Sequence, residues 1–362
     1  MNPKQLLTLL AAAVILAGAW LLLDRRRGRS ASPAEIGRTV LAGVDLNAVA
    51  LVEVRHGGKR LEIVRDTNGV WRVPSLAGYP ADLARVRARL LALADITIGD
   101  VVRGMDFDNP SALILKDKSG QELAALHLGP VRQGGASGGM VWQPPEGRYL
   151  RAGNNPDAWL VKEPLNEFTA EPRAWVDTRL FKISANDVIN ITITYADAEE
   201  ARFQRENGAF AMKDLADDET FDTSKFNGIE SALAYLSFVD VLPASTPDTI
   251  TGLSTGTVFH VVSDVYLEGA EGGHLVESSI LRIGNTSPDG NRYAAFNYAN
   301  DVICDSATIA LPYIFTIPAH IAANMTRPRA EFIKPAENFI QTNDDDEPAA
   351  AANDGKDDEA EE

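Results

Sequence analysis

The sequence has little of what covalent crosslinking or metal binding requires. It contains one cysteine among 362 residues, and a lone cysteine can neither form an intramolecular disulfide nor build a metal site by itself. The five histidines lack the spacing of a zinc motif and stand near no cysteine pair. We therefore predict no metal centre and no cofactor, and expect these residues to be structural: Cys304, His56, His127, His260, His274 and His320.

Motifs of phosphate binding and acyl transfer are missing too. The Gly-rich segment from Gly129 to Met140, GPVRQGGASGGM, does not end in Gly-Lys-Ser or Gly-Lys-Thr. No helical pattern follows it, so we interpret it as a flexible loop. No G-x-S-x-G sequence is present, which leaves a serine hydrolase without support. We predict no catalytic residue, and an enzyme ranks behind two non-catalytic hypotheses.

Basic residues are scarce relative to acidic ones, and the imbalance is concentrated at one end. The net charge is −17. From Asp344 to Glu362 there are ten acidic residues and one lysine, a net charge of −9, which leaves −8 on the rest of the chain. An acidic body makes nucleic-acid binding through phosphate contacts unfavourable. The acidic segment has no apolar periodicity, so we predict a disordered tail over 331–362.

A single hydrophobic run is long enough to cross a membrane. Leu6 to Leu23 is uncharged and mostly apolar, and as a helix it would measure about 27 Å, close to the thickness of a bilayer core. We favour an uncleaved membrane anchor with a basic flank over 1–30, followed by a linker over 31–39. A cleaved signal peptide remains open, because Ala17-Gly18-Ala19 has the small-x-small form of a cleavage site.

The charges beside this run do not fix its orientation. Four arginines follow it in DRRRGR, and a strict positive-inside count would place the body in the cytoplasm. Large domains, however, often cross the membrane regardless of nearby charge. We expect a single-pass inner-membrane protein with a periplasmic body.

Two short stretches of the chain are nearly the same. RDTNGVWRV, from Arg65, and RENGAFAMK, from Arg205, each place Asn-Gly shortly before an aromatic residue. Asn-Gly between apolar runs predicts a hairpin with a type I′ turn, in which both central residues have positive φ. We interpret the aromatics as core anchors rather than ligand contacts. The predicted structural anchors of the repeat are Asn68, Gly69, Trp71, Asn207, Gly208 and Phe210.

The helix that follows each hairpin repeats as well. Leu83, Val86, Leu90 and Leu93 recur at steps of three, four and three residues, and Phe226, Ile229, Leu233 and Leu236 do the same 143 residues later. Such stripes predict core-facing helices. We expect Asp82 to cap the first helix, Thr223 or Ser224 to cap the second, and Arg85, Arg87 and Arg89 to form a solvated face.

These patterns predict an α+β fold built as two tandem, duplicated domains after a transmembrane helix. Each domain would hold a mixed or antiparallel sheet with one covering helix, in the order ββ-β-α-ββ-ββ. We place the first repeat at 40–165, a junction at 166–182 and the second repeat at 183–330.

A family resemblance agrees with this organisation. The membrane span, the alternating strand after Asp45, NGVWRV, YPAD at the start of a helix and ELAALHLG resemble the bacterial proteins of domain-of-unknown-function family 4340. The resemblance extends from Val40 to about Pro318. It implies a membrane-anchored protein that acts beside ABC transporters of the gliding-motility auxiliary type, and it implies no catalytic residue.

Two functional hypotheses follow. The first is a non-enzymatic accessory or scaffold protein, held in the membrane by Leu6 to Leu23, whose partners are the membrane subunits of an ABC transporter. The second is a periplasmic module that binds a glycan or peptide in the cleft between the two repeats, because clefts between domains are common ligand sites. The sequence sets no oligomeric state.

Overall fold

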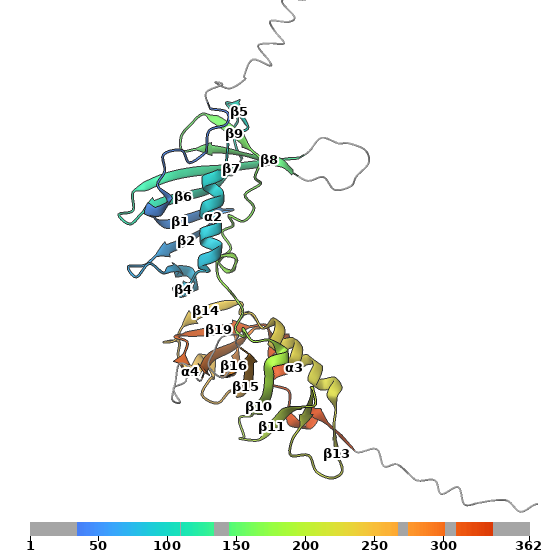
Figure 1. Cartoon of the computed structure of the whole chain (residues 1–362). Coiled ribbons are helices and arrows are strands. Elements are labelled where there is room, and N and C mark those ends of the chain that lie inside the picture. The colour runs from blue at the N-terminus through green and yellow to red at the C-terminus, as the bar shows by residue number, and fades with distance from the viewer. Residues whose placement is uncertain (1–34, 109, 134–144, 267–273, 301–308, 336–362) are drawn as a thin grey trace, which may run out of the picture.

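The computed structural model describes residues 35–108, 110–133, 145–266, 274–300 and 309–335 (Figure 1). The predicted membrane anchor, Cys304 and the acidic residues from Asp344 onward lie outside these ranges. Within them, no helix is both long enough and apolar enough to cross a membrane.

The first half of the chain forms a nine-stranded sheet. Its spatial order is β4-β3-β2-β1-β6-β7-β8-β9-β5. The helix α2 (Leu83–Asp95) follows β4 at one edge and precedes β5 at the other. The strands are β1 (Val49–His56), β2 (Lys59–Arg65), β3 (Trp71–Val73), β4 (Tyr79–Pro80), β5 (Asp100–Arg103), β6 (Ser111–Asp117), β7 (Glu122–Gln133), β8 (Pro145–Ala152) and β9 (Asp157–Val161).

The second half forms another sheet, of order β12-β11-β10-β15-β16-β17-β19-β14, with β18 paired to β17. Its strands are β10 (Val188–Thr194), β11 (Glu200–Glu206), β12 (Ala209–Met212), β14 (Asp240–Pro243), β15 (Thr257–Tyr266), β16 (His274–Thr286), β17 (Arg292–Asn300), β18 (Ile309–Ala310) and β19 (Tyr313–Ile317). The pair β13 (Glu219–Phe221) and β20 (Ile333–Pro335) stands apart from this sheet. The helices are α3 (Thr223–Tyr235), α4 (Asp248–Thr251) and α5 (Ala319–Met325).

The two sheets share one strand order once β4 is set aside. In each, three strands run outward in sequence, a helix crosses to the far edge, and the next long strand returns to the centre. The predicted α+β class is confirmed in coarse form, as mixed structure with mostly antiparallel sheets and few helices.

The predicted element order omitted β5 and β14. Each has only four residues, too few to show alternation, and each pairs with the last strand of its sheet, β5 with β9 and β14 with β19. Their place is therefore set by a distant partner strand rather than by a local pattern.

The first Asn-Gly hairpin is not the predicted type I′ turn. Asn207 and Gly208 both have positive φ, at 50° and 87°, as that turn requires, but in the first hairpin only Gly69 does, at 82°. The first loop is longer, because Arg65 pairs with Trp71 and five residues separate them. The carboxylate of Asp66 accepts hydrogen bonds from the backbone N–H groups of Asn68 and Val70 and so stabilises the longer loop.

The helix caps follow the prediction in one half only. Asp82 caps α2 by accepting a hydrogen bond from the N–H of Arg85. The prediction of Thr223 or Ser224 as the cap of α3 is wrong, because Asp222 caps the helix and accepts from both the N–H and the hydroxyl of Ser224. A carboxylate one residue earlier thus serves the exposed N–H groups of the first turn.

The predicted core stripe of α2 is correct in its centre and wrong at its start. Val86 and Leu93 are fully buried and Leu90 is half-buried, whereas Leu83 is 44% exposed. At about 100° per residue, Leu83 lies roughly 60° around the helix from Val86, and Leu90 lies roughly 40° away. Burial therefore falls with angular distance from the centre of the stripe. All four stripe residues of the second half are buried, including Leu236 directly after α3.

A segment near the end of each half packs on its helix. The carbonyl oxygen of Trp175 accepts a hydrogen bond from the N–H of Asp82, and that of Phe332 accepts one from the N–H of Asp222. Both aromatic side chains are fully buried. They end the short 3-10 helices Pro172–Trp175 and Arg329–Phe332, and the first of these lies in the segment that we predicted as a junction.

The two sheets meet at an aromatic joint. The ring of Tyr79 lies edge-on to three rings of the second half, with centroid distances of 5.1 Å to Phe238, 5.1 Å to Tyr313 and 5.9 Å to Phe315. The hydroxyl of Tyr313 donates a hydrogen bond to the carbonyl oxygen of Gly78. Burial, and then the nearby Asp177 and Tyr313, raise the pKa of Tyr79 to about 12. One continuous hydrophobic core includes residues of both sheets.

Candidate functional site

The predicted anchors of the repeat occupy matching places in different sheets. Trp71 begins β3 and is 6% exposed, and Phe210 lies in β12 and is 8% exposed. The guanidinium of Arg205 stacks 4.3 Å from the centre of the Phe210 ring. Asn68 and Gly69 form one hairpin loop, and Asn207 and Gly208 form the other. The structure does not bring the two sets together into a common site.

The histidines are also dispersed. His56 and Ser111 share a hydrogen bond of 2.6 Å on the first sheet, and His260 and Ser278 share one of 2.8 Å on the second. Burial lowers the pKa of His260. His127 lies in β7 and His320 in α5, and the side chain of His274 is outside the described residues. In the described ranges, no group of three His, Cys, Asp or Glu side chains could hold a metal ion.

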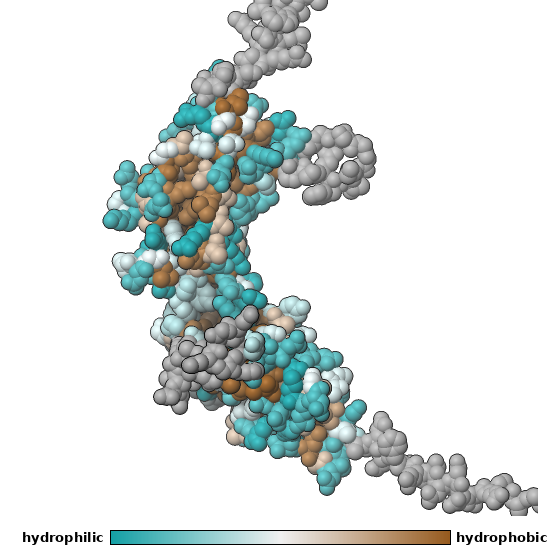
Figure 2. Space-filling model, viewed as in Figure 1, coloured by the Kyte–Doolittle hydropathy of each residue, from teal (hydrophilic) through white to brown (hydrophobic). Residues whose placement is uncertain are grey.

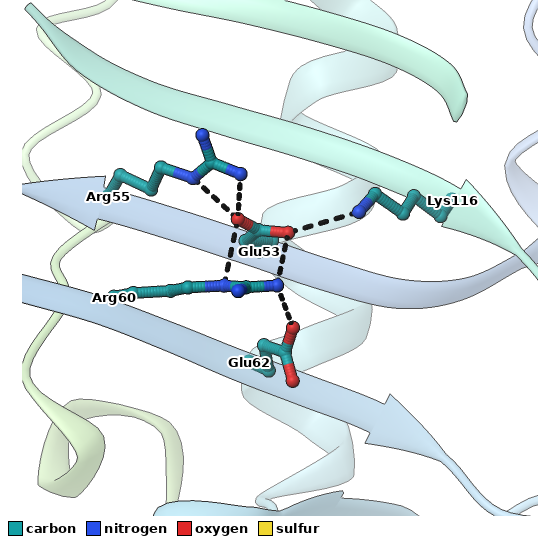
Figure 3. Close-up of polar contacts among 5 residues, drawn as sticks. All are labelled: Glu53, Arg55, Arg60, Glu62 and Lys116. Atoms are coloured by element: carbon teal, nitrogen blue, oxygen red, sulfur yellow. Dashed lines mark hydrogen bonds and ion pairs between the residues drawn. The ribbon is translucent and has the colours of Figure 1, made fainter. Parts of the chain in front are cut away.

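The densest polar cluster surrounds Glu53 in the middle of β1 (Figure 3). Its side chain is completely buried, yet it lies on the sheet face opposite α2. One carboxylate oxygen contacts Nε and Nη2 of Arg55, both at 2.5 Å, and Nε of Arg60 at 3.0 Å. The other contacts Nη2 of Arg60 and Nζ of Lys116, both at 3.2 Å. Three cations thus shield this carboxylate from water.

A fifth residue completes the cluster. Nη2 of Arg60 also contacts Glu62 at 2.5 Å. The side chains of Arg55 and Arg60 are 52% and 55% exposed, so the outer layer of the cluster is wet while Glu53 is dry. The five side chains sum to one net positive charge, and the cations form its outer surface.

The pKa of Glu53 is held below its ordinary value. Burial alone raises the pKa, because it disfavours the charged carboxylate. The hydrogen bonds and positive charges of Arg55 and Lys116 together outweigh burial and favour the ionised form. Glu53 is therefore fixed as a carboxylate near neutral pH. Such a group suits the positioning of the guanidinium groups around it, whereas a general acid would need a raised pKa.

Strand register explains the cluster. A two-residue turn at Gly57-Gly58 makes β2 pair back on β1, so that Glu53 faces Glu62 and Arg55 faces Arg60. Like charges directly opposite are unfavourable, and the diagonal contact of Arg60 with Glu53 relieves this repulsion. Sequence reasoning missed the cluster, although VEVRHGGKRLE contains the signal. Its charged residues alternate with apolar ones on both sides of a Gly-Gly turn, and that turn fixes the register.

The arginines of α2 do more than form the predicted solvated face. Nη1 of Arg85 donates to the carbonyl oxygen of Val176 at 2.8 Å, and Nη2 of Arg89 donates to that of Ala174 at 3.0 Å. Arg89 is half-buried, and its guanidinium lies 4.0 Å from the centre of the Trp175 ring. Arg87 alone of the three is exposed without a contact of this kind. The prediction is thus wrong for Arg89, which holds the segment between the sheets onto the helix.

Comparison with known proteins gives one family match. A family model described as Domain of unknown function (DUF4340) matches residues 71–254, about half of the chain. The match begins at Trp71, so it includes Lys116 of the Glu53 cluster but precedes none of the β1 and β2 residues. No curated protein and no solved structure matches the chain.

Proposed function

This chain belongs to the DUF4340 family, and we propose that it is a membrane-anchored, extracytoplasmic, non-enzymatic accessory or scaffold protein. In this proposal it works with an ABC-type transport system of the gliding-motility auxiliary type. The anchor is Leu6 to Leu23, and the partners are the membrane subunits of the transporter. The body is a rigid spacer that presents binding surfaces.

We infer that this body arose by tandem duplication. The shared strand order of the two sheets supports the inference. So does the constant spacing of equivalent contacts, because the isolated bridges Thr39–Thr97 and Arg179–Ser237 are offset by 140 residues, as are the capping residues Asp82 and Asp222. Equivalence of contacts at one offset is expected of a duplicated unit and has no reason to arise by convergence of local pattern alone.

The observation that carries the scaffold proposal is the aromatic joint. Duplicated domains on a free linker would move independently, whereas Tyr79 packs among three rings of the second sheet and continues the core across the boundary. A shared apolar core resists relative motion of two domains. Such a body can hold two binding surfaces at a fixed separation, which is what a scaffold requires.

Exposed hydrophobic side chains support a protein partner. Figure 2 shows hydrophobic residues at the surface of the first half, in the region where Figure 1 places α2. On α2, Leu91 is 64% exposed and Leu83 is 44% exposed, and Tyr235 at the end of α3 is 74% exposed. Apolar groups on the outer faces of both helices are suited to contact with another protein.

The alternative of a ligand site between the repeats is the weaker proposal. Tyr79, Phe238 and Phe315 are packed ring against ring where the sheets meet. The cavities found among the described residues are each lined by one half only.

Two experiments test the proposal. Fusion of alkaline phosphatase to the C-terminus reports the side of the membrane, because the enzyme is active only outside the cytoplasm; an inactive fusion with intact protein levels would contradict an extracytoplasmic body. The affinity-tagged full chain, extracted from native membranes in mild detergent, should retain ABC transporter subunits identified by mass spectrometry. Recovery of the chain alone at every detergent strength would count against the scaffold role.

A further inference from the structure

A cationic cavity lies at the β1–β2 turn, beside the Glu53 cluster. Its volume is about 560 Å³, and its lining contains three permanent cations and no carboxylate. The lining residues are Arg55, His56, Gly57, Gly58, Lys59, Arg60 and Pro110. A smaller cavity of about 280 Å³ shares His56 and carries Asp106 and Asp108, so the positive lining is local to the turn.

The two guanidinium groups of this cavity are held from behind. Glu53 binds Nε and Nη2 of both Arg55 and Arg60. The Nη1 groups have no hydrogen-bond partner among the described residues, and Figure 3 shows one nitrogen of Arg55 pointing away from Glu53. Arginine otherwise loses considerable side-chain freedom when it binds a ligand. Here the buried carboxylate has already fixed both side chains.

Lys59 adds a third cation whose charge is uncompensated. It opens β2, is exposed, and forms no ion pair within the described ranges. Gly57 and Gly58 both have positive φ, and a Cβ at either would meet nothing within 4 Å. The backbone of the turn is therefore open to close approach by a ligand.

We propose that this cavity binds a phosphate group, supplied by a soluble phosphorylated molecule or by a lipid headgroup. Planar guanidinium groups present paired N–H donors that match the oxygens of phosphate, and an ammonium group adds a compact charge. Glu53 acts as a positioning residue, because it holds the two arginines without contacting the ligand. The site lies in the first half only, since Thr192 occupies the place in β10 that corresponds to Glu53 in β1.

The test uses the full chain in nonionic detergent and isothermal titration calorimetry. One arm titrates sodium pyrophosphate. The other titrates a short-chain phosphatidylglycerol, with the matching phosphatidylcholine as a reference of no net charge. The test variant is Lys59→Gln, which removes an exposed cation of the cavity. The control is Lys225→Gln, the same change at an exposed position of α3 in the other half.

We expect binding to weaken about tenfold in Lys59→Gln and to stay at the wild-type value in Lys225→Gln, the size of effect that loss of one charge-assisted hydrogen bond produces. This result with pyrophosphate identifies a soluble ligand, and with phosphatidylglycerol alone it identifies a lipid headgroup. The proposal is overturned if neither probe binds the wild-type chain, or if the two variants bind equally.

Discussion

Replacement of Tyr79 by alanine should uncouple the two halves of the protein. The change removes three edge-to-face ring contacts with Phe238, Tyr313 and Phe315. At about 0.5–1.5 kcal/mol each, these contacts contribute roughly 1.5–4.5 kcal/mol beyond simple burial. Tyr79 is only partly buried, so the loss of transferred area is smaller than for a fully buried aromatic residue. We expect a total destabilisation of about 2–4 kcal/mol.

The distribution of tryptophan provides the assay. All five tryptophans precede residue 183, so tryptophan fluorescence reports the first half, while far-ultraviolet circular dichroism reports both. In wild type, the urea unfolding curves from the two signals should coincide because the core is continuous. In Tyr79→Ala they should separate. Tyr79→Phe is the matched control, since it keeps the ring and should leave the curves together. Coincident curves in Tyr79→Ala with a loss below about 1 kcal/mol would refute a joint that couples the sheets.

Further predictions concern the repeat anchor, the glycine contacts and the charged cluster. Trp71→Ala should cost about 3–5 kcal/mol in urea unfolding, because the side chain is buried, and a near-neutral result would mean that it is exposed. Gly284→Ala should cost about 1–3 kcal/mol and more than Gly129→Ala, because its new Cβ would collide with the backbone carbonyl of Thr251 rather than with a side chain; thermal unfolding in the opposite order would contradict this. Glu53→Gln should lower stability at pH 7 by about 1–3 kcal/mol, since charged hydrogen bonds are lost. The folded-state pKa of Glu53 is below 4.5, so its contribution is present above that pH and is lost as pH falls through the folded value; a difference between variant and wild type that persists unchanged into acid would exclude this origin.

The central elements of the fold could be predicted because their signals are local. Alternation in β1 and β10, Asn-Gly loops and the apolar stripes of α2 and α3 depend on neighbours within a few residues. Details that depend on one extra residue were less secure. The loop at Asn68 differs from that at Asn207 only by a longer connection, yet this changes the turn type.

The aromatic joint could not be predicted from local pattern. Tyr79 contacts Phe238 and Tyr313 across more than 150 residues of chain, and nothing near Tyr79 indicates which surface will cover it. The segments that close each half were, in contrast, visible in the sequence. EPRAW, ending at Trp175, and RPRAEF, ending at Phe332, share Pro-Arg-Ala before a buried aromatic residue.

The Glu53 cluster stands between these cases. The Gly57-Gly58 turn sets the register of β1 and β2, so the facing of Glu53 with Glu62 follows from the sequence. Complete burial of Glu53 does not follow, because it also needs Lys116 from β6, which reaches the sheet centre only after the helix crossover. The cluster is thus half local and half a product of topology.

The scaffold account is tested most directly by crosslinking mass spectrometry on intact native membranes. A lysine-reactive crosslinker meets exposed lysines in both halves, such as Lys59 in β2 and Lys225 in α3. The account predicts crosslinks from these lysines to subunits of an ABC transporter, at the stoichiometry of a stable complex. Crosslinks confined to the chain itself, with the transporter present in the same membranes, would contradict it.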